Sequence, residues 1–399
     1  MEGEAALRVG YQRKGYPEIR NIVGSRSGAR YVLVPDGNRV RAKACRGAKR
    51  IFRLRCDPTD LDFTFRGIGF PPVDLVHFFN AISFGSRPWL STFETILPRF
   101  RQALTCHHGE TPDFSVLARD PQVLRALEAL AGDPCRRLIA LSRCNLEMQH
   151  ALLRHFPEHQ DAIARKLVHL APPQMPLIGA LEEKGLRWDG ELRFVFVGSS
   201  FFTKGGPEVL RTLARLRRDG HPVRLTIVSA LSPTSHARIV SREDVDAILR
   251  EIRNGADWIE HFRALPNPAV LDLMRRSHIG LLPSFAETYG FAVLEFQAAG
   301  CPVVTTDVRA LPEINNEETG WLISVPKNRF GEALFTSRED QQKLARSIEV
   351  GLARILEEIL LQPEVAAVKG QRSLERVRRD HSPEVHGARL REIYRDALG

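Results

Sequence analysis

The chain has 399 residues and a net charge of +9, and 43% of its residues are hydrophobic and 26% charged. This length is enough for two domains, each burying its own core, and the composition is that of a globular protein. The first residues lack an apolar signal core, and no uncharged apolar run reaches the ~18 residues of a membrane span, so we expect neither secretion nor membrane spanning. Six scattered cysteines without metal-ligand spacing favour reduced thiols and a cytoplasmic protein.

The positive charge is concentrated near the start of the chain. From Arg8 to Arg55 there are 14 Lys or Arg residues and two acidic residues. Such a basic region favours binding to an anionic membrane surface, here the inner face of the membrane, or to a phosphorylated substrate. The alternative is a basic surface that contacts only solvent. No nucleic acid is expected, because the basic residues lack interleaved aromatic residues and a nucleic-acid motif.

The first part of the chain, residues 1–70, is predicted to form short strands and turns. Strands are expected at Arg30–Val34, Val40–Ala44 and Arg50–Arg55, and a turn at Pro35–Asn38. We find neither an apolar first strand nor a glycine-rich loop after it. The sequence therefore predicts an atypical, β-rich N-terminal portion.

An α/β pattern follows this portion. Strands are predicted at Val73–Asn80, Pro88–Glu94, Arg137–Ser142 and Lys166–Pro173. Asn80 and Glu94 stand where two of these strands end, and Ser142 is expected to cap the next helix. The adjacent His107 and His108 cannot point the same way in a regular structure and have no third ligand nearby, so no metal site is expected.

The polar, proline-flanked stretch 177–190 is predicted to be a linker to a second domain. That domain opens with a strand at Leu192–Gly198 and a helix at Pro207–Arg218. Between them, Gly198 and Gly205 let backbone N–H groups approach a phosphate, and Lys204 adds a positive charge. A solvated loop lysine is the alternative interpretation of Lys204.

Further elements are predicted along the rest of the chain. They are strands at Val223–Ser229, Trp258–Phe262 and Trp321–Val325, and helices at Glu243–Arg253, Pro266–Ser277, Asp340–Leu361 and Ser382–Leu398. Asn267 is the expected N-cap of the helix that leads into the central unit of the second domain.

That central unit is residues 279–306, which read as strand, loop, helix and strand. The strand Ile279–Pro283 leads into a loop that feeds the helix Phe291–Ala299, which is the place where open α/β sheets bind ligands. Two carboxylates mark the unit, Glu287 in the loop and Glu295 in the helix. Glu295 lies among apolar residues and needs a partner, which could be sugar or ribose hydroxyls or a structural arginine.

The motif Glu287-Thr-Tyr-Gly-Phe-Ala-Val-Leu-Glu295 resembles the Glu-x7-Glu signature of retaining glycosyltransferases of family 4. The surrounding sequence matches the family pattern in order. These matches are Leu282-Pro-Ser, Ala299-Gly-Cys-Pro-Val-Val, Pro312-Glu-Ile and Thr319-Gly-Trp-Leu. The family's Gly-Arg-x5-Lys-Gly element is matched at Gly198, Lys204 and Gly205, but Ser199 stands in the place of its arginine.

The resemblance implies an α/β GT-B fold, in which two Rossmann-like domains face a cleft. It implies domains at 1–176 and 191–380, the linker 177–190, and a C-terminal helix at 381–399 that crosses back to the first domain. It also implies a metal-independent transfer of a sugar, with retention, from a UDP-, GDP- or ADP-sugar to a glycan or lipid-linked acceptor. No cofactor is implied.

The resemblance carries specific roles to residues of this chain. Glu287 would contact the donor sugar and Glu295 the ribose, while Lys204 would face the diphosphate. The neighbouring candidates for donor binding are Gly198, Ser199, Ser200, Gly205, Thr288, Tyr289, Gly290 and Phe291. Asn80 and Glu94 are candidates for the acceptor side, with loop capping as the alternative.

Alternative functions remain open at this point. A catalytically inactive GT-B protein that senses nucleotide sugars or acts as a partner subunit would fit the change at Ser199. An epimerase or a phosphorylase would use the same fold, and the basic charge permits a nucleic-acid binder.

Overall fold

The computed structural model describes residues 6–12, 15–52, 59–69, 71–106, 109–188, 190–233 and 237–399. His107, His108 and the last residues of the strand predicted at 50–55 lie outside them. The chain forms two compact units. Of the described residues, unit 1 contains those up to Cys106, Thr111–Pro173 and His381–Gly399. Unit 2 contains Gly109, Glu110 and Gln174–Asp380.

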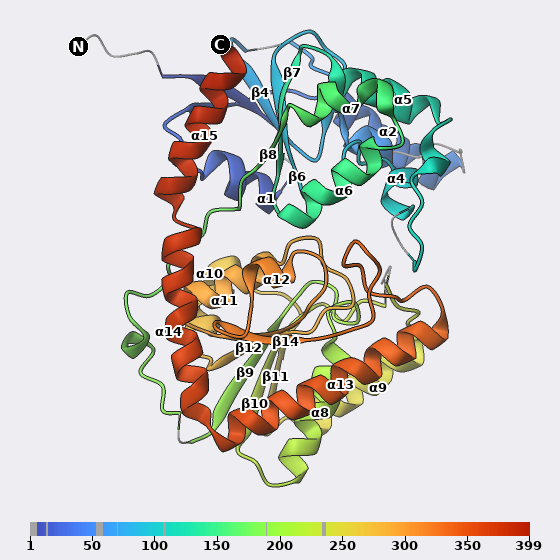
Figure 1. The fold of residues 1–399 in the computed structure, drawn as a ribbon. Coiled ribbons are helices and arrows are strands. Elements are labelled where there is room, and N and C mark those ends of the chain that lie inside the picture. Colours follow the sequence, from blue (N-terminus) through green and yellow to red (C-terminus); the bar gives the residue numbers. More distant parts are fainter. Residues whose placement is uncertain are drawn as a thin grey trace, which may run out of the picture. The chain divides into compact units, whose positions relative to one another are not determined.

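The described residues of unit 1 form a six-stranded parallel sheet in the order β2-β1-β4-β6-β7-β8 (Figure 1). The strands are β1 Arg8–Tyr11, β2 Arg30–Leu33, β4 Leu75–Phe79, β6 Trp89–Phe93, β7 Cys135–Ala140 and β8 Leu167–His169. A two-stranded ribbon pairs β3 Thr64–Phe65 with β5 Ile82–Ser83. The helices are α1 Tyr16–Glu18, α2 Gly37–Phe52, α3 Thr59–Asp62, α4 Arg101–Thr105, α5 Pro121–Ala131, α6 Arg143–Leu153, α7 Pro157–Ala164 and α15 Pro383–Leu398, and single turns lie at Ile19–Val23 and Ser115–Leu117.

The N-terminal portion corrects the sequence prediction. The strands predicted at Val40–Ala44 and at Arg50–Ile51 are wrong, because both stretches belong to helix α2. A first strand also exists, since β1 lies between β2 and β4 in the parallel sheet. Within the described residues this portion is therefore not β-rich. It is the start of a Rossmann-like unit.

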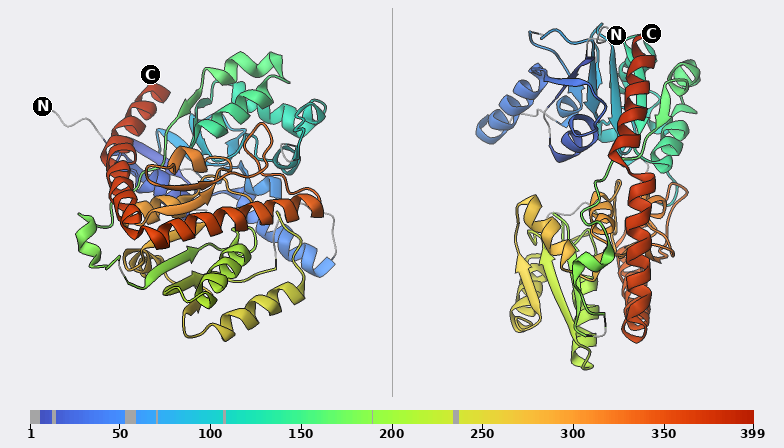
Figure 2. Two further views of the ribbon diagram at one scale, coloured as in Figure 1. Left: turned by 60° about the horizontal axis from the view of Figure 1, so that its bottom comes forward. Right: turned by 90° about the vertical axis from the view of Figure 1, so that its left-hand side faces the viewer.

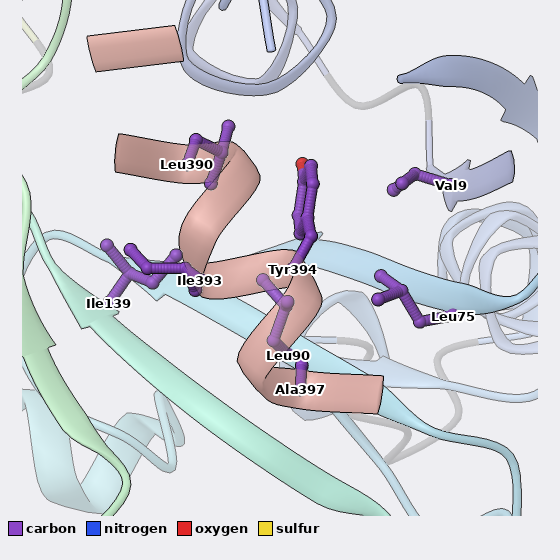
Figure 3. Packing of buried hydrophobic residues seen from close by; sticks show 8 residues of the cluster. All are labelled: Val9, Leu75, Leu90, Ile139, Leu390, Ile393, Tyr394 and Ala397. Carbon is purple, nitrogen blue, oxygen red and sulfur yellow. The ribbon is translucent and has the colours of Figure 1, made fainter. Parts of the chain in front are cut away.

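The last helix, α15, packs on the sheet of unit 1. Figure 3 shows Leu390, Ile393 and Tyr394 of α15 directed at the strands, and they form one buried cluster with residues of four of them. The strand residues are Val9, Leu75, Leu90 and Ile139. Tyr394 is fully buried, and its hydroxyl contacts His77 Nδ1 at 2.8 Å and Tyr31 Oη at 3.2 Å. The end of the chain thus completes the core of unit 1.

The described residues of unit 2 form a second six-stranded parallel sheet in the order β11-β10-β9-β12-β13-β14 (Figure 1). The strands are β9 Leu192–Val197, β10 Val223–Val228, β11 Ile259–Phe262, β12 Ile279–Leu282, β13 Val303–Thr306 and β14 Gly320–Ile323. The helices are α8 Gly206–Arg218, α9 Arg242–Asn254, α10 Asn267–Arg275, α11 Phe291–Ala298, α12 Leu311–Ile314, α13 Arg338–Leu361 and α14 Pro363–Asp380, and a 3-10 turn lies at Leu181–Lys184.

The elements predicted for the second domain are present, with ends that differ by a few residues. The prediction of Asn267 as a helix cap is wrong, because Pro266 holds that position and Asn267 is the first residue of α10. Ser142 does cap α6, since its Oγ accepts a hydrogen bond from Asn145 N at 3.1 Å. The sequence analysis missed α14, which lies along the side of unit 2 and packs on α11 and β14 (Figure 2).

Candidate functional site

The candidate site of unit 2 is built on two loops that leave neighbouring strands. Strands β9 and β12 pair in parallel, so the loop 198–205 after β9 and the loop 283–290 after β12 start at the same edge of the sheet. Lys204 comes from the first loop and Glu287 from the second. Their side chains form an ion pair, with 2.5 Å between Lys204 Nζ and Glu287 Oε2. Lys204 Nζ also donates a hydrogen bond to Ala286 O at 3.2 Å.

Backbone contacts hold the two loops against each other. Phe285 N of the second loop donates to Thr203 O of the first at 2.8 Å. The side chain of Thr306, at the end of β13, also fixes the second loop, since its Oγ1 donates to Ser284 O at 2.6 Å. Gly205 has φ +78°, and a Cβ there would lie 2.1 Å from Pro283 O. No side chain fits in that space, so a glycine is required where the loops meet. The Lys204–Glu287 pair is therefore held on a closely fixed backbone.

Both loops end in a helix whose cap is a glycine in the left-handed conformation. Gly205 caps α8, and Gly290, with φ +99°, caps α11. Neither glycine cap has a side chain that could accept from the first helical turn. Gly206 N donates to Phe201 O and Val293 N to Gly290 O, each at 2.9 Å, and an anion can bind the N–H groups that remain in the two first turns. The two loops thus bring together Lys204 and the N-terminal, positive ends of the α8 and α11 dipoles.

The remaining candidates of the first loop differ in exposure. Ser199 is exposed, whereas Ser200 is half-buried and its hydroxyl donates to Thr203 Oγ1 at 2.8 Å. Gly198 N continues the sheet by donating to Val228 O at 3.1 Å. A Cβ on Gly198 would lie 3.1 Å from Lys204 Cγ, so this glycine leaves room for the lysine stem.

The candidates of the second loop lie at the start of α11. Thr288 N donates to Glu287 Oε1 at 3.1 Å, which orients the carboxylate. Tyr289 is buried, and its ring centroid lies 5.3 Å from that of Phe291. Glu295 lies in α11 with 6% of its surface exposed, between the apolar residues Leu294 and Phe296. The structure thus places all the donor-side candidates on the two loops and on the helix that follows the second one.

One arginine near these loops was missed by the sequence analysis. Arg238 Nη1 pairs with Oε1 of the fully buried Glu208 in the first turn of α8, at 2.8 Å. Its guanidinium carbon also lies 5.1 Å from the centre of the Phe285 ring, in the second loop. Nothing local in the polar stretch around Arg238 signals this, because both contacts come from residues that are distant in sequence.

The acceptor-side candidates of unit 1 contact each other. Asn80 has φ +56° directly after β4, and its Nδ2 donates to Glu94 Oε1 at 3.2 Å. Glu94 N donates in return to Asn80 Oδ1 at 3.1 Å. Arg99 Nη1, which the sequence analysis missed, donates to Glu94 Oε1 at 2.9 Å. The carboxyl ends of β4 and β6 therefore carry a small polar network.

A cavity of ≈820 Å³ lies beyond the ends of β1 and β2 in unit 1. Its lining includes Gln12, Asp36 and two cations, Arg39 and Lys43, beside apolar side chains. Several of those apolar side chains are exposed, namely Tyr16, Ile19, Leu33 and Val40. The cavity therefore combines apolar surface with positive charge.

No group of three or more His, Cys, Asp or Glu side chains in the described part of the chain is arranged to hold a metal ion. Among the helices that the structure describes, none has the length and apolar character needed to cross a membrane.

Comparison with known proteins identifies the class of unit 2. Residues 191–340 match the family model described as "Glycosyl transferases group 1". This confirms the resemblance that the sequence motifs indicate, because residues 191–340 are similar to the group 1 glycosyltransferase family.

Curated relatives match part of the chain. A "D-inositol 3-phosphate glycosyltransferase" of Rhodococcus erythropolis is 31% identical over 34% of this chain and 30% of its own length. Another protein of that name, from Pseudarthrobacter chlorophenolicus, is 30% identical over 48% of this chain and 44% of its own length. A "Glycogen synthase" of Mycobacterium tuberculosis is 30% identical over 33% of this chain and 30% of its own length. The chain thus spans less than half the length of these relatives.

Solved structures match over nearly the whole chain. Sucrose-phosphate synthase from Thermosynechococcus elongatus has a TM-score of 0.58 at 14% identity, covering 98% of both chains. Anabaena HepE in complex with UDP has a TM-score of 0.58 at 13% identity, covering 98% of this chain and 99% of its own. These likenesses confirm the GT-B fold, with two Rossmann-like parallel sheets.

Proposed function

We propose that the protein is a retaining glycosyltransferase that transfers a sugar from a nucleotide-diphosphate donor to a glycan or lipid-linked acceptor. The observation that carries the proposal is the Lys204–Glu287 pair, 2.5 Å apart, on two loops that each feed a glycine-capped helix. The family match over residues 191–340 supports it.

In this proposal the cations stabilise the leaving group. As the bond between the anomeric carbon and the diphosphate breaks, negative charge develops on the phosphate oxygen. Lys204 and the N-terminal amides of α8 and α11 would stabilise that charge without a metal ion. The acceptor oxygen forms the new bond to the anomeric carbon, and its proton passes to the leaving phosphate.

The two glutamates would position the donor. Glu287 would accept hydrogen bonds from hydroxyls of the donor sugar, and Glu295 from the ribose. Thr288 N holds the Glu287 carboxylate at 3.1 Å, which supports such an orienting role. Gly198, Ser199, Ser200, Gly205, Tyr289, Gly290 and Phe291 complete the proposed donor site.

The acceptor is proposed to bind unit 1. Asn80 and Glu94 stand at the carboxyl ends of β4 and β6, and the ≈820 Å³ cavity lies beyond β1 and β2. Exposed Leu33 and Val40 beside Arg39 and Lys43 suit an acceptor with an apolar part and a negative charge, such as a lipid-linked one. The same surface supports peripheral binding to an anionic membrane.

The first experiment is a panel of UDP-, GDP- and ADP-sugars, with thermal stability and donor hydrolysis measured together. A bound donor stabilises the native state by mass action. Stabilisation by one donor with release of its nucleoside diphosphate supports the proposal and identifies the donor. No stabilisation by any donor would overturn it.

A second candidate is a catalytically inactive protein that senses nucleotide sugars or serves as a partner subunit. The observation in its favour is Ser199, which replaces the arginine of the family element. Stabilisation by a donor, with no release of nucleoside diphosphate in the presence of a range of glycan and lipid-linked acceptors, would favour this candidate.

A further inference from the structure

Unit 1 holds a second cavity, of ≈780 Å³, which we call the arginine pocket. Its floor is apolar and consists of buried side chains, namely Phe65, Val76, Phe78, Trp89 and Phe100. Four arginines are part of its lining, and they are Arg41, Arg66, Arg87 and Arg125. They are contributed by α2, by the chain next to β3, by the loop before β6 and by α5. Separate elements thus bring cations to one cavity.

The arginine pocket is distinct from the proposed acceptor side. Asn80, Glu94 and Arg99, at the carboxyl ends of β4 and β6, are not part of its lining. Its floor includes Val76, the second residue of β4, and Trp89, the first residue of β6. The pocket therefore uses another part of unit 1, where α2 packs on β3 and α5 on β5.

Three of the four pocket arginines are not paired with a carboxylate in the part of the chain that the structure describes. Among the described residues, no aspartate or glutamate lines the pocket, and the guanidinium groups of Arg41, Arg66 and Arg125 have no carboxylate partner. Arg125 instead lies over the ring of Phe84, 4.7 Å from its centre. Positive groups that share a cavity repel each other, and a bound anion removes that repulsion.

A carboxylate beside the pocket is already used elsewhere. Asp36 Oδ1 accepts the backbone N–H groups of Asn38 at 3.0 Å and Arg66 at 3.1 Å, and Oδ2 accepts Gln12 Nε2 at 2.7 Å. These bonds fix the backbone around Asn38 and Arg66 at the pocket. Asp36 thus positions the residues that line the pocket and does not neutralise the Arg66 side chain.

The floor contributes a further polar group without a partner. Trp89 is 1% exposed, and its indole N–H has no hydrogen-bond acceptor among the described residues. A buried donor without an acceptor is unfavourable, and Trp89 lines the pocket. A ligand with oxygen atoms would provide acceptors at the floor as well as negative charge at the arginines.

We propose that the arginine pocket binds a phosphate monoester, with the phosphate between the arginines and the rest of the ligand over the aromatic floor. Arginine forks match phosphate oxygens in pairs, and rings pack well on Phe and Trp side chains. The volume is in the range of small-molecule sites. The ester is either a soluble molecule or the headgroup of a phospholipid. This site is separate from the donor site and does not depend on the proposed transfer.

The test uses the full-length protein and two probes of this chemistry. Glucose 6-phosphate represents the soluble source, and phosphatidic acid in phosphatidylcholine vesicles represents the lipid source. Binding is measured by calorimetry and by vesicle sedimentation at constant ionic strength. Glucose and pure phosphatidylcholine serve as the uncharged controls. We expect one charged probe to bind and its control not to bind.

Variants locate the bound probe. Arg66→Gln and Arg125→Gln should each weaken binding about tenfold or more, as expected for the loss of a charge-assisted hydrogen bond. Arg215→Gln, at an exposed ion pair with Glu357 in unit 2, removes the same charge elsewhere and should leave binding unchanged. Urea denaturation of each variant checks that the fold is intact.

Two results would overturn the proposal. One is the absence of binding by both charged probes at millimolar concentration. The other is binding that is lost in Lys204→Ala but retained in Arg66→Gln and Arg125→Gln, because the phosphate would then occupy the proposed diphosphate site. Binding that needs the pocket arginines and not Lys204 supports the proposal, and the probe that binds identifies the source.

Discussion

Lys204 and Glu287 are 83 residues apart in the sequence, and their side chains form an ion pair with 2.5 Å between Nζ and Oε2. Both side chains are largely buried, with 19% and 11% of their surface exposed. The Lys204 ammonium group is thus paired with the Glu287 carboxylate. A diphosphate that binds Lys204 has to compete with Glu287 for it.

This competition predicts that substitutions of Lys204 and of Glu287 have different effects on the affinity for a nucleoside diphosphate. Lys204→Ala should weaken the binding of a nucleoside diphosphate by more than tenfold, or about 1.4 kcal/mol, because the full positive charge is lost. Glu287→Gln should leave that affinity unchanged or raise it, since Lys204 loses its competing partner, and should lower turnover about a hundredfold. Calorimetry and donor turnover measure the two quantities.

A matched control for Lys204→Ala is Lys343→Ala, which removes an exposed lysine that pairs with Glu339 on α13. It should change neither affinity nor turnover. A Glu287→Gln variant with full turnover would contradict the role proposed for this carboxylate, whatever its nucleotide affinity.

Gly205 should not tolerate a side chain. A Cβ there would lie 2.1 Å from Pro283 O, so Gly205→Ala must separate the two loops. We expect a loss of about 3 kcal/mol or more in the free energy of unfolding of unit 2, from backbone strain and steric overlap together. Urea denaturation measures this loss.

Gly220→Ala separates the contribution of backbone strain from that of steric overlap. Gly220 also has a positive φ, +90°, but a Cβ there meets no atom within 4 Å. This variant should lose only about 1 kcal/mol from the left-handed conformation. Equal losses in both variants would mean that the contact with Pro283 does not matter.

Ser199 offers a test by gain of function. The residue is exposed, so Ser199→Arg introduces the cation of the family element without displacing a buried group. We expect nucleoside diphosphate affinity to rise about tenfold, the scale of a charge-assisted hydrogen bond. Gln342→Arg, on the exposed side of α13, controls for the added charge. Equal affinity gains in both variants would indicate a general effect of charge.

The stability of the protein should fall in mild acid because of buried histidines. Burial lowers the pKa of His77 to about 3, with a smaller effect of His386, and burial lowers the pKa of His278 to about 4. The unfolded chain titrates near ~6.5 and therefore binds more protons than the folded chain below that pH. The stabilisation by neutral histidine is complete above about pH 6.5 and decreases as the pH falls toward 4.

His77→Gln should reduce this pH dependence. Each buried histidine contributes up to about 1.4 kcal/mol per pH unit to the slope, and the variant removes one of them. Because His77 contacts Tyr394 and Thr92, the variant will also lose stability at pH 7.5, so the slope between pH 7 and 5 is the decisive quantity. His150→Gln changes an exposed residue of α6 and should keep the wild-type slope.

Local patterns in the sequence were sufficient for much of unit 2. Buried β-branched runs predicted its strands, and the motif around Glu287 and Glu295 predicted the family and the GT-B fold. The same reasoning failed at α2, where Arg39, Arg41 and Lys43 alternate with small or apolar residues and imitate a strand. In the helix, Asn38 and Ala42 lie one turn apart, and both are buried. Burial against the rest of the unit, and not the local alternation, determines that element.

The sequence by itself indicated which residues are candidates for donor binding and how most strands and helices of unit 2 follow each other. Only the tertiary structure decided that Lys204 pairs with Glu287, that Arg99 joins Asn80 and Glu94, and that arginines from separate elements line one cavity. The physical reason is that hydrophobic periodicity and turn residues act over a few positions along the chain. Charges and hydrogen bonds in a site instead depend on side chains that parallel strands and their loops bring together from distant positions.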